Sequence, residues 1–235
     1  MRAPFPLMLF AAGFGTRMGQ LTATQPKPLI RVAGLPLIDH ARRLAAQAGV
    51  QRQVANLHYR GEQLAQHLAG TGVALSWEKE TILDTGGGLK AALPLLGDGP
   101  VLTLNTDAIW TGPNPLTRLM QMWDPERMDQ LFLLLPAAQA QSASGRSDFV
   151  MDSQGRVDWA KGRDGFLYLG AQIIQPHLLT ESEAAFSLHG PWSRAMAAGR
   201  AYGVLHQGGW CDVGHPGGIA VAERLLRDAK EWPGV

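Results

Sequence analysis

Cysteine is almost absent from this sequence, since Cys211 is the only one among 235 residues. A single thiol forms no internal disulfide and no cysteine-rich metal site, which excludes disulfide-stapled folds and zinc ribbons. This usage fits a reducing compartment, and we therefore expect a cytoplasmic protein.

Long apolar runs and an excess of one charge are also lacking. The longest mostly apolar stretch, residues 3–14, is shorter than the roughly 20 residues of a membrane span. Two prolines interrupt it and one basic residue precedes it, so we expect a buried strand and a turn, not a cleaved signal peptide. The net charge of +1 gives no field to hold a nucleic acid or an anionic membrane. We expect neither as a partner, and nothing indicates an obligate protein partner.

Apolar residues, by contrast, are plentiful. They make up 46% of the chain against 17% charged residues, which is enough for a core and excludes disorder. The length favours one compact domain. Short apolar runs alternate with segments of helical spacing, which predicts crossover units, a parallel sheet and helices on both faces. Strands are expected at residues 7–11, 53–57, 73–77, 101–105, 130–135 and 166–174, a hairpin at 149–159, and helices at 36–48, 61–68, 88–96, 115–122, 191–198 and 216–230.

The first motif reads A-A-G-F-G-T-R-M over residues 11–18, directly after a predicted strand. Glycine lets backbone N–H groups approach a phosphate closely, so the loop is a candidate anion cradle. A tight turn with an exposed Arg17 is the alternative. Met18 occupies the third glycine position of a dinucleotide fingerprint, and no P-loop motif occurs in the chain. Dehydrogenases and P-loop enzymes are therefore excluded.

Lys27 lies between two prolines, Pro26 and Pro28, which stiffen the backbone and disfavour helix at the residue before each. We expect its ammonium group to be held on an extended segment. The planar guanidinium of Arg17 and the compact ammonium of Lys27 are complementary ways to neutralise a polyphosphate. Together they favour phosphoryl chemistry over a solvated loop lysine.

At this point the sequence resembles the sugar-1-phosphate nucleotidyltransferases. The matching stretch is residues 9–37, with the glycine loop, Leu21-Thr22, P-K-P-L at 26–29 and V-A-G-L-P-L at 32–37. The resemblance implies a Rossmann-like three-layer α/β/α fold with a mostly parallel mixed central sheet, formed by one domain of residues 1–235. Residues 1–110 would be its nucleotide-binding half and residues 111–235 its sugar-phosphate-binding half. The resemblance also implies that the glycine loop wraps a nucleoside triphosphate and that Arg17 and Lys27 contact its phosphates.

A second glycine-rich segment reads D-T-G-G-G-L over residues 84–89, before a helical pattern. Three successive glycines cost backbone entropy, so we expect something large against this backbone, the alternative being a glycine-rich start of the helix. The segment resembles that of the short N-acetylmuramate-1-phosphate uridylyltransferases, which implies nucleoside contacts from Thr85 and Gly86. The residues expected to bind the nucleotide are Ala11, Ala12, Gly13, Gly15, Thr16, Arg17, Lys27, Thr85, Gly86 and Asn105.

Two aspartates are candidate metal ligands. Asp107 follows an apolar strand, where ligands collect in open α/β sheets, and Asp212 precedes the helix expected from Pro216. Either one alone would more often be a cap or turn residue. Two carboxylates suit Mg²⁺, which takes one or two together with phosphate oxygens and water. By resemblance, Asp107 and Asp212 hold Mg²⁺, and Asp107 joins Arg17 and Lys27 as a catalytic residue.

The acceptor side is less clearly marked. Gly170 matches a substrate-side strand glycine, and Trp110 either stacks on a sugar or packs in the core, so these two are the residues expected to bind the sugar phosphate. His215 is expected to begin a helix and not to act as a base, because a phosphate nucleophile is already ionised near pH 7. The residues Asn56, His58 and Tyr59 also match the short uridylyltransferases, without an assigned role.

Three positions depart from the pattern common in relatives. Gln20 replaces a proline, Thr106 a glycine and His215 a threonine. The first is expected to loosen the glycine loop, and the other two leave the shape around the metal open.

The expected reaction is magnesium-dependent transfer of UMP from UTP to a sugar 1-phosphate, with N-acetylmuramic acid 1-phosphate as acceptor, giving a UDP-sugar and pyrophosphate in cell-wall sugar recycling. One alternative is a nucleotidyltransferase that uses GTP, CTP or dTTP, or a hexose or phosphocholine acceptor. A catalytically silent nucleotide-sugar sensor and a secreted binding protein are the others.

Overall fold

A computed structural model of the chain describes residues 5–140 and 147–229. Within these ranges, no helix combines the length and the apolar character that crossing a membrane requires. The predicted final helix reaches residue 230, which lies outside the described residues.

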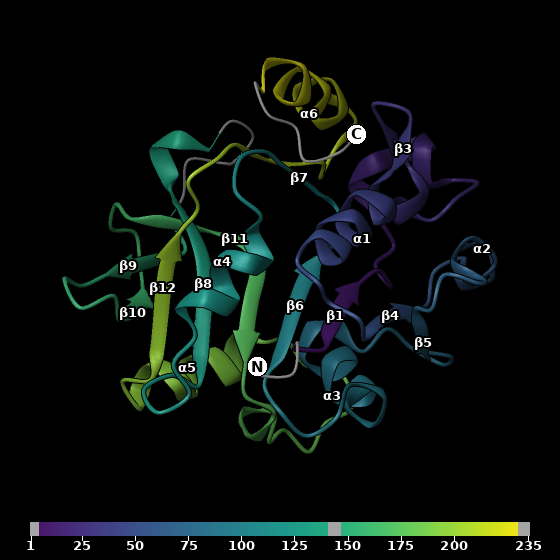
Figure 1. Cartoon of the computed structure of the whole chain (residues 1–235). Coiled ribbons are helices and arrows are strands. Elements are labelled where there is room, and N and C mark those ends of the chain that lie inside the picture. The colour runs from purple at the N-terminus through teal and green to yellow at the C-terminus, as the bar shows by residue number, and fades with distance from the viewer. Residues whose placement is uncertain (1–4, 141–146, 230–235) are drawn as a thin grey trace.

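Residues 1–110 supply one side of a nine-stranded sheet (Figure 1). Strands β5 (Ala74–Trp77), β4 (Gln53–Leu57), β1 (Leu7–Phe10) and β6 (Val101–Asn105) lie in that order, and each pair is parallel. All four predicted strands are therefore confirmed to within a residue. Parallel strands end at the same edge, so the segments after β1 and β6 meet there.

The other half of the chain continues the same sheet. The strand β11 (Phe166–Ile174) is antiparallel to β6 and to β8 (Gln130–Pro136), and β8 is parallel to β12 (Ala201–Leu205). The hairpin of β9 (Phe149–Met151) and β10 (Val157–Trp159) joins at the start of β11. All strands of the sheet except β10 and β11 point the same way as β1, so the predicted mostly parallel mixed sheet is confirmed.

Helices cover both faces of this sheet. Side chains alternate between the faces of a strand, and in β1 Leu7 and Leu9 pack into one apolar cluster while Met8 packs into another. The first cluster contains residues of α1, α2 and α4, and the second contains residues of α3 and α5. The bounds are α1 (Leu37–Gln47), α2 (Gly61–Leu68), α3 (Asp84–Leu96), α4 (Pro115–Met122), α5 (His189–Ala197) and α6 (Pro216–Asp228).

The helix α6 lies at the top of the view in Figure 1 and belongs to a third, smaller cluster, which also includes Ile109 of β7 (Ala108–Trp110). The strand β7 pairs with β13 (Trp210–Asp212) in a separate antiparallel ribbon. A second ribbon joins β2 (Arg31–Val32) to β3 (Leu35–Pro36). These short strands, together with β12, were not among the predicted elements.

Candidate active site

Two adjoining cavities open at the edge where β1 and β6 end. The first, of about 320 Å³, is lined by the glycine loop, Lys27, Asn56, Thr85 and their neighbours. The second, of about 510 Å³, is lined mainly by residues of β11, β13 and the turn before α6. Three residues line both cavities, namely Arg17, Asn105 and Asp107. Molecules in the two cavities would therefore meet at these three side chains.

The glycine loop follows β1 without a break and is held by contacts on both sides. Gly15 has a left-handed φ of 64°, and a Cβ there would lie 2.9 Å from Lys27 Cβ, so the loop turns close over Lys27. The side chain of Met18 is fully buried and anchors the end of the motif. The guanidinium-bearing Arg17 stays exposed.

His58 and Tyr59 brace this loop from the segment after β4. The ring of Phe14 packs edge-on against His58 at 5.4 Å and lies 5.7 Å from the ring of Tyr59. The Tyr59 hydroxyl donates to the Thr22 carbonyl oxygen at 2.8 Å. His58 and Tyr59, two of the three residues without an assigned role, thus fix the outer side of the glycine loop.

Lys27 and Asp107 form an ion pair at the centre of the site. Their Nζ and Oδ2 atoms are 2.5 Å apart, and Lys27 is only 9% exposed. Lys27 begins a 3₁₀ turn after the extended Pro26, so the expected extended backbone at Lys27 is wrong. The Thr106 hydroxyl donates to the Phe10 carbonyl oxygen at 2.8 Å and closes the turn that carries Asp107.

Asp212 lies beside Asp107 because β13 pairs with β7, with Asp212 opposite Ala108. Burial raises the pKa of the Asp212 carboxyl, the negative charge of Asp107 raises it further, and Lys27 and Arg17 act in the opposite direction. The pairing of two short strands therefore brings together two carboxylates from positions 105 residues apart in the chain.

Arg17 approaches this pair across Gly214. A Cβ at Gly214 would lie 2.6 Å from Asp212 Oδ2 and 3.2 Å from both terminal guanidinium nitrogens of Arg17. The guanidinium and the second carboxylate are therefore neighbours. Arg17, Lys27, Asp107 and Asp212, four residues predicted to act together, lie in one place.

The two carboxylates are a donor set that fits Mg²⁺. Within the described ranges, no group of three or more His, Cys, Asp and Glu side chains is arranged to hold a metal ion. Mg²⁺ commonly takes one or two carboxylates and completes its shell with phosphate oxygens and water. A divalent cation would also relieve the repulsion that raises the pKa of Asp212. Asp107 and Asp212 thus suit a metal shared with substrate.

Gly170 makes room for Asn105 at the border of the cavities. It has a φ of 79° where the register of β11 against β8 shifts, and a Cβ there would lie 2.7 Å from Asn105 Nδ2. Trp110, expected at the sugar, is 5% exposed and packs against Trp210 in the core. Trp210 and Tyr168 line the second cavity instead.

The second glycine-rich segment is the first turn of α3 and not a loop before the helix. The Gly86 and Gly87 N–H groups both donate to the Phe186 carbonyl oxygen, at 2.9 and 3.0 Å. A Cβ on Gly86 would overlap Phe186, and one on Gly87 would overlap the Ala184 carbonyl. What lies against these two glycines is therefore the chain's own segment. Gly86 is not among the residues that line the first cavity, whereas Thr85 lines it.

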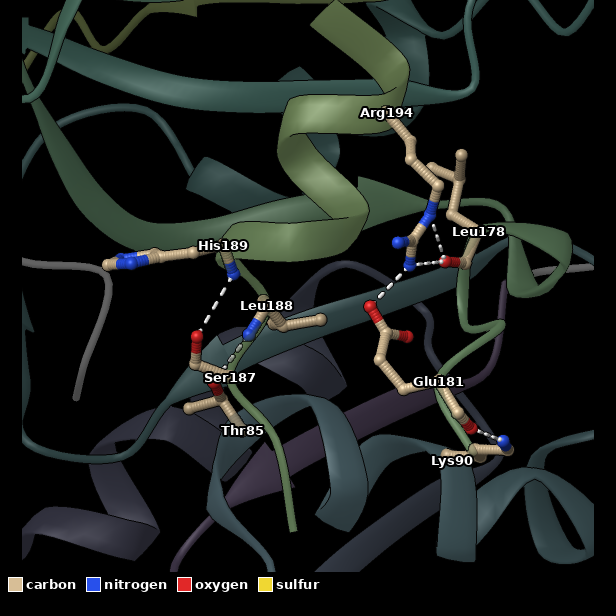
Figure 2. A network of polar contacts seen from close by, with 8 residues as sticks. All are labelled: Thr85, Lys90, Leu178, Glu181, Ser187, Leu188, His189 and Arg194. Atoms are coloured by element: carbon tan, nitrogen blue, oxygen red, sulfur yellow. Dashed lines mark hydrogen bonds and ion pairs between the residues drawn. The ribbon is translucent and has the colours of Figure 1, made fainter. Parts of the chain in front are cut away.

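A hydrogen-bond network holds that segment in place (Figure 2). The Leu188 N–H donates to Thr85 Oγ1 at 3.2 Å, and Lys90 Nζ donates to the Glu181 carbonyl oxygen. At the other side, Arg194 pairs with Glu181 and donates to the Leu178 carbonyl oxygen. Residues 178–194 thus hold the turn of α3 that faces the first cavity.

Comparison with known proteins gives the class of this protein. The chain belongs to the MobA-like NTP transferase domain family, whose model matches residues 7–229. The solved structure of a putative glucose-1-phosphate thymidylyltransferase from Bacillus anthracis has the same fold, with a TM-score of 0.77, 15% identity and 97% of each chain covered.

Two curated relatives are similar over almost their whole length. The N-acetylmuramate alpha-1-phosphate uridylyltransferase of Caulobacter vibrioides is 35% identical, over 97% of this chain and 99% of the relative. The enzyme of the same name from Neisseria meningitidis serogroup B is 35% identical, over 88% of this chain and 92% of the relative. The chain is accordingly a sugar-1-phosphate nucleotidyltransferase, as its sequence motifs predicted.

Proposed function

We propose that this protein transfers UMP from UTP to N-acetylmuramic acid 1-phosphate, releasing pyrophosphate and forming the UDP-sugar, in cytoplasmic cell-wall sugar recycling. The pair of adjoining cavities that share Arg17, Asn105 and Asp107 carries the proposal, because it gives two phosphate-bearing substrates a common border. The near full-length similarity to two N-acetylmuramate alpha-1-phosphate uridylyltransferases supports this choice of nucleotide and acceptor.

In this proposal the first cavity holds the nucleoside triphosphate. The backbone of Ala11, Ala12, Gly13, Gly15 and Thr16 wraps the phosphates, since each of these residues lines the cavity. Thr85 and Asn105 face the nucleotide from the opposite wall. Arg17 and Lys27 neutralise the triphosphate, which positions it and offsets the charge that develops on the departing pyrophosphate.

The second cavity holds the sugar 1-phosphate, with Gly170 and Trp210 on its wall. An ionised phosphate oxygen attacks the α-phosphorus in line, and the bond to the β-phosphate oxygen breaks with its electron pair leaving on pyrophosphate. No base is needed, because this oxygen carries no proton near pH 7. Mg²⁺ on Asp107 and Asp212 would supply charge neutralisation between the two sets of phosphates.

The test is pyrophosphate release from UTP, GTP, CTP and dTTP, each combined with the 1-phosphates of N-acetylmuramic acid, N-acetylglucosamine, glucose and mannose, and with phosphocholine. The proposal predicts the highest kcat/KM for UTP with N-acetylmuramic acid 1-phosphate, by about tenfold or more over any other pair. Highest activity with GTP and mannose 1-phosphate would assign a guanylyltransferase. Thermal stabilisation by UTP without pyrophosphate release from any pair would assign a sensor.

A further inference from the structure

A buried polar pair, Asn56 and Glu78, joins the two walls of the first cavity. Asn56 lies near the end of β4 and is 4% exposed, while Glu78 follows β5 and is 3% exposed. The Asn56 amide Nδ2 donates to Glu78 Oε1 at 2.7 Å. The pair was not explained by the expected site, since Asn56 had no assigned role and Glu78 was not singled out.

Each side chain of the pair also accepts one backbone N–H group. The Ala11 N–H donates to Asn56 Oδ1 at 2.8 Å, and the Leu83 N–H donates to Glu78 Oε2 at 2.8 Å. Ala11 is the first residue of the glycine loop, and Leu83 directly precedes α3. Three hydrogen bonds in series therefore run from the end of β1 to the start of α3.

Gly88 shows that the fold reserves space for this pair. A Cβ on Gly88 would lie 2.7 Å from Glu78 Oε1 and 2.9 Å from Asn56 Nδ2. Gly88 lies inside α3, where alanine would normally favour the helix. The third glycine of the segment thus faces the buried pair, whereas the first two face the segment around Phe186.

Burial makes these hydrogen bonds consequential. A buried donor or acceptor that loses its partner retains the full cost of desolvation, and this cost is larger for a charged group. Glu78 also holds the chain through its backbone, because its N–H donates to the Leu57 carbonyl oxygen and its own carbonyl oxygen contacts His58 Nδ1. A substitution at Glu78 is therefore expected to shift both the glycine loop and the first turn of α3.

We propose that Asn56 and Glu78 are positioning residues that set the glycine loop and the first turn of α3 at the spacing that nucleotide binding requires. Glu78 acts on Ala11 through Asn56 and on the first turn of α3 through Leu83, and it does not touch substrate. The inference rests on the nucleotide occupying the first cavity, as proposed above, and holds for whichever nucleoside triphosphate the enzyme takes.

Exchanging the two functional groups tests the series of hydrogen bonds. In Glu78→Gln an amide N–H₂ replaces one acceptor, so either Asn56 Nδ2 or the Leu83 N–H loses its partner. In Asn56→Asp two carboxylates face each other. In the double variant, the carboxylate introduced at position 56 accepts from the Ala11 N–H and from the new amide at position 78, whose oxygen accepts from Leu83. All three hydrogen bonds and the total charge are then restored.

The experiment compares wild type, both single variants, the double variant and Glu80→Gln. The last makes the same chemical change two residues away, on an exposed side chain. Nucleotide Kd is measured by calorimetry without acceptor, KM is measured for each substrate, and melting temperature reports folding. Each single variant is expected to weaken nucleotide binding about tenfold, with the acceptor KM changed less than about twofold. The double variant is expected to regain most of this loss, and Glu80→Gln to match wild type.

Single variants that bind the nucleotide as wild type does would overturn the proposal, and so would a double variant whose loss equals the product of the two single losses. If a single variant fails to fold, Gly88→Ala provides the test. Its added Cβ would displace Glu78 Oε1 and Asn56 Nδ2 without changing a polar group. Weakened nucleotide binding in Gly88→Ala supports the proposal, and normal binding with raised stability overturns it. The nucleotide used is the one that wild type binds, so a wild type that prefers another triphosphate refutes the proposed substrate alone.

Discussion

At the scale of single residues, Gly170 links backbone conformation to both cavities. An alanine there would adopt a left-handed φ, which costs roughly 1–2 kcal/mol, and its Cβ would press on Asn105. Because Asn105 lines both cavities, Gly170→Ala is expected to lower kcat/KM for both substrates by about tenfold. Steady-state kinetics and thermal unfolding measure the two effects separately.

The matched control is Gly155→Ala, where φ is 83° but the nearest atom to a Cβ is 3.8 Å away. It carries the same backbone strain in a turn far from the cavities. If Gly170→Ala loses stability but keeps the kinetics of Gly155→Ala, then Asn105 is not held by Gly170.

The sequence allowed the prediction of residues whose chemistry is local. Asp107 follows a buried strand and Lys27 lies between prolines. In both cases the neighbouring few residues are enough to mark the position as a candidate for the site. Trp210 and Glu78 gave no such pattern, because their roles come from partners far away in the chain. The glycines at 86 and 87 showed that something lies close, but only the fold shows that it is residues 184–186.

At the scale of elements, the contact between α3 and the segment before α5 predicts that a glycine-to-alanine change in the helix lowers the stability of the protein. A glycine-to-alanine change inside a helix normally stabilises it by about 1 kcal/mol. Gly87→Ala is expected instead to destabilise the protein, because its Cβ would overlap the Ala184 carbonyl. Thermal unfolding tests the sign, and faster protease cleavage near residue 184 is expected in the variant. A raised melting temperature would contradict the packing of this segment on α3.

Buried histidines predict how stability depends on pH. His206, at the end of β12, is 5% exposed, its Nε2 donates to the Thr111 carbonyl oxygen at 3.1 Å, and burial lowers its pKa below the ordinary 6.5. Below pH 6.5 the unfolded chain takes up a proton that the folded chain does not, so stability falls as pH falls. The loss is at most about 1.4 kcal/mol per pH unit for this group.

Urea unfolding at pH 7.5 and 5.5 measures this loss, and His206→Gln is expected to reduce it. Because burial also lowers the pKa of His40, the pH dependence should shrink and not vanish. An equal loss in wild type and His206→Gln would show that His206 does not contribute.

Sequence patterns predicted most helices and strands but missed β12 and the short strands outside the central sheet. Apolar patterns predicted the six helices and eight of the nine strands of the central sheet, but not β12. The strands β7 and β13 have three residues each and gain their pairing from each other, across about 100 positions. The pairing of β7 with β13 nevertheless forms an essential part of the site, because it places Asp212 beside Asp107.

At the scale of the whole molecule, both halves of the chain contribute strands to the sheet. Both halves also contribute residues to the walls of the two cavities. The first half supplies the glycine loop and Lys27, and the second half supplies Asp212, Gly170 and the segment that clamps α3. Alternating strands and helices made the α/β architecture predictable from the sequence. The antiparallel β11 at the border of the halves was not predictable in direction, since its partners β6 and β8 are fixed only on folding.

The most direct measurement is turnover against magnesium concentration for wild type and Asp107→Asn at saturating substrates. Asp98→Asn, an exposed carboxylate after α3, is the control. If Asp107 and Asp212 hold Mg²⁺ at the border of the cavities, Asp107→Asn turns over at least about 10²-fold more slowly at every magnesium concentration, with an unchanged fold. An Asp107→Asn enzyme that retains wild-type turnover throughout the titration would contradict the account.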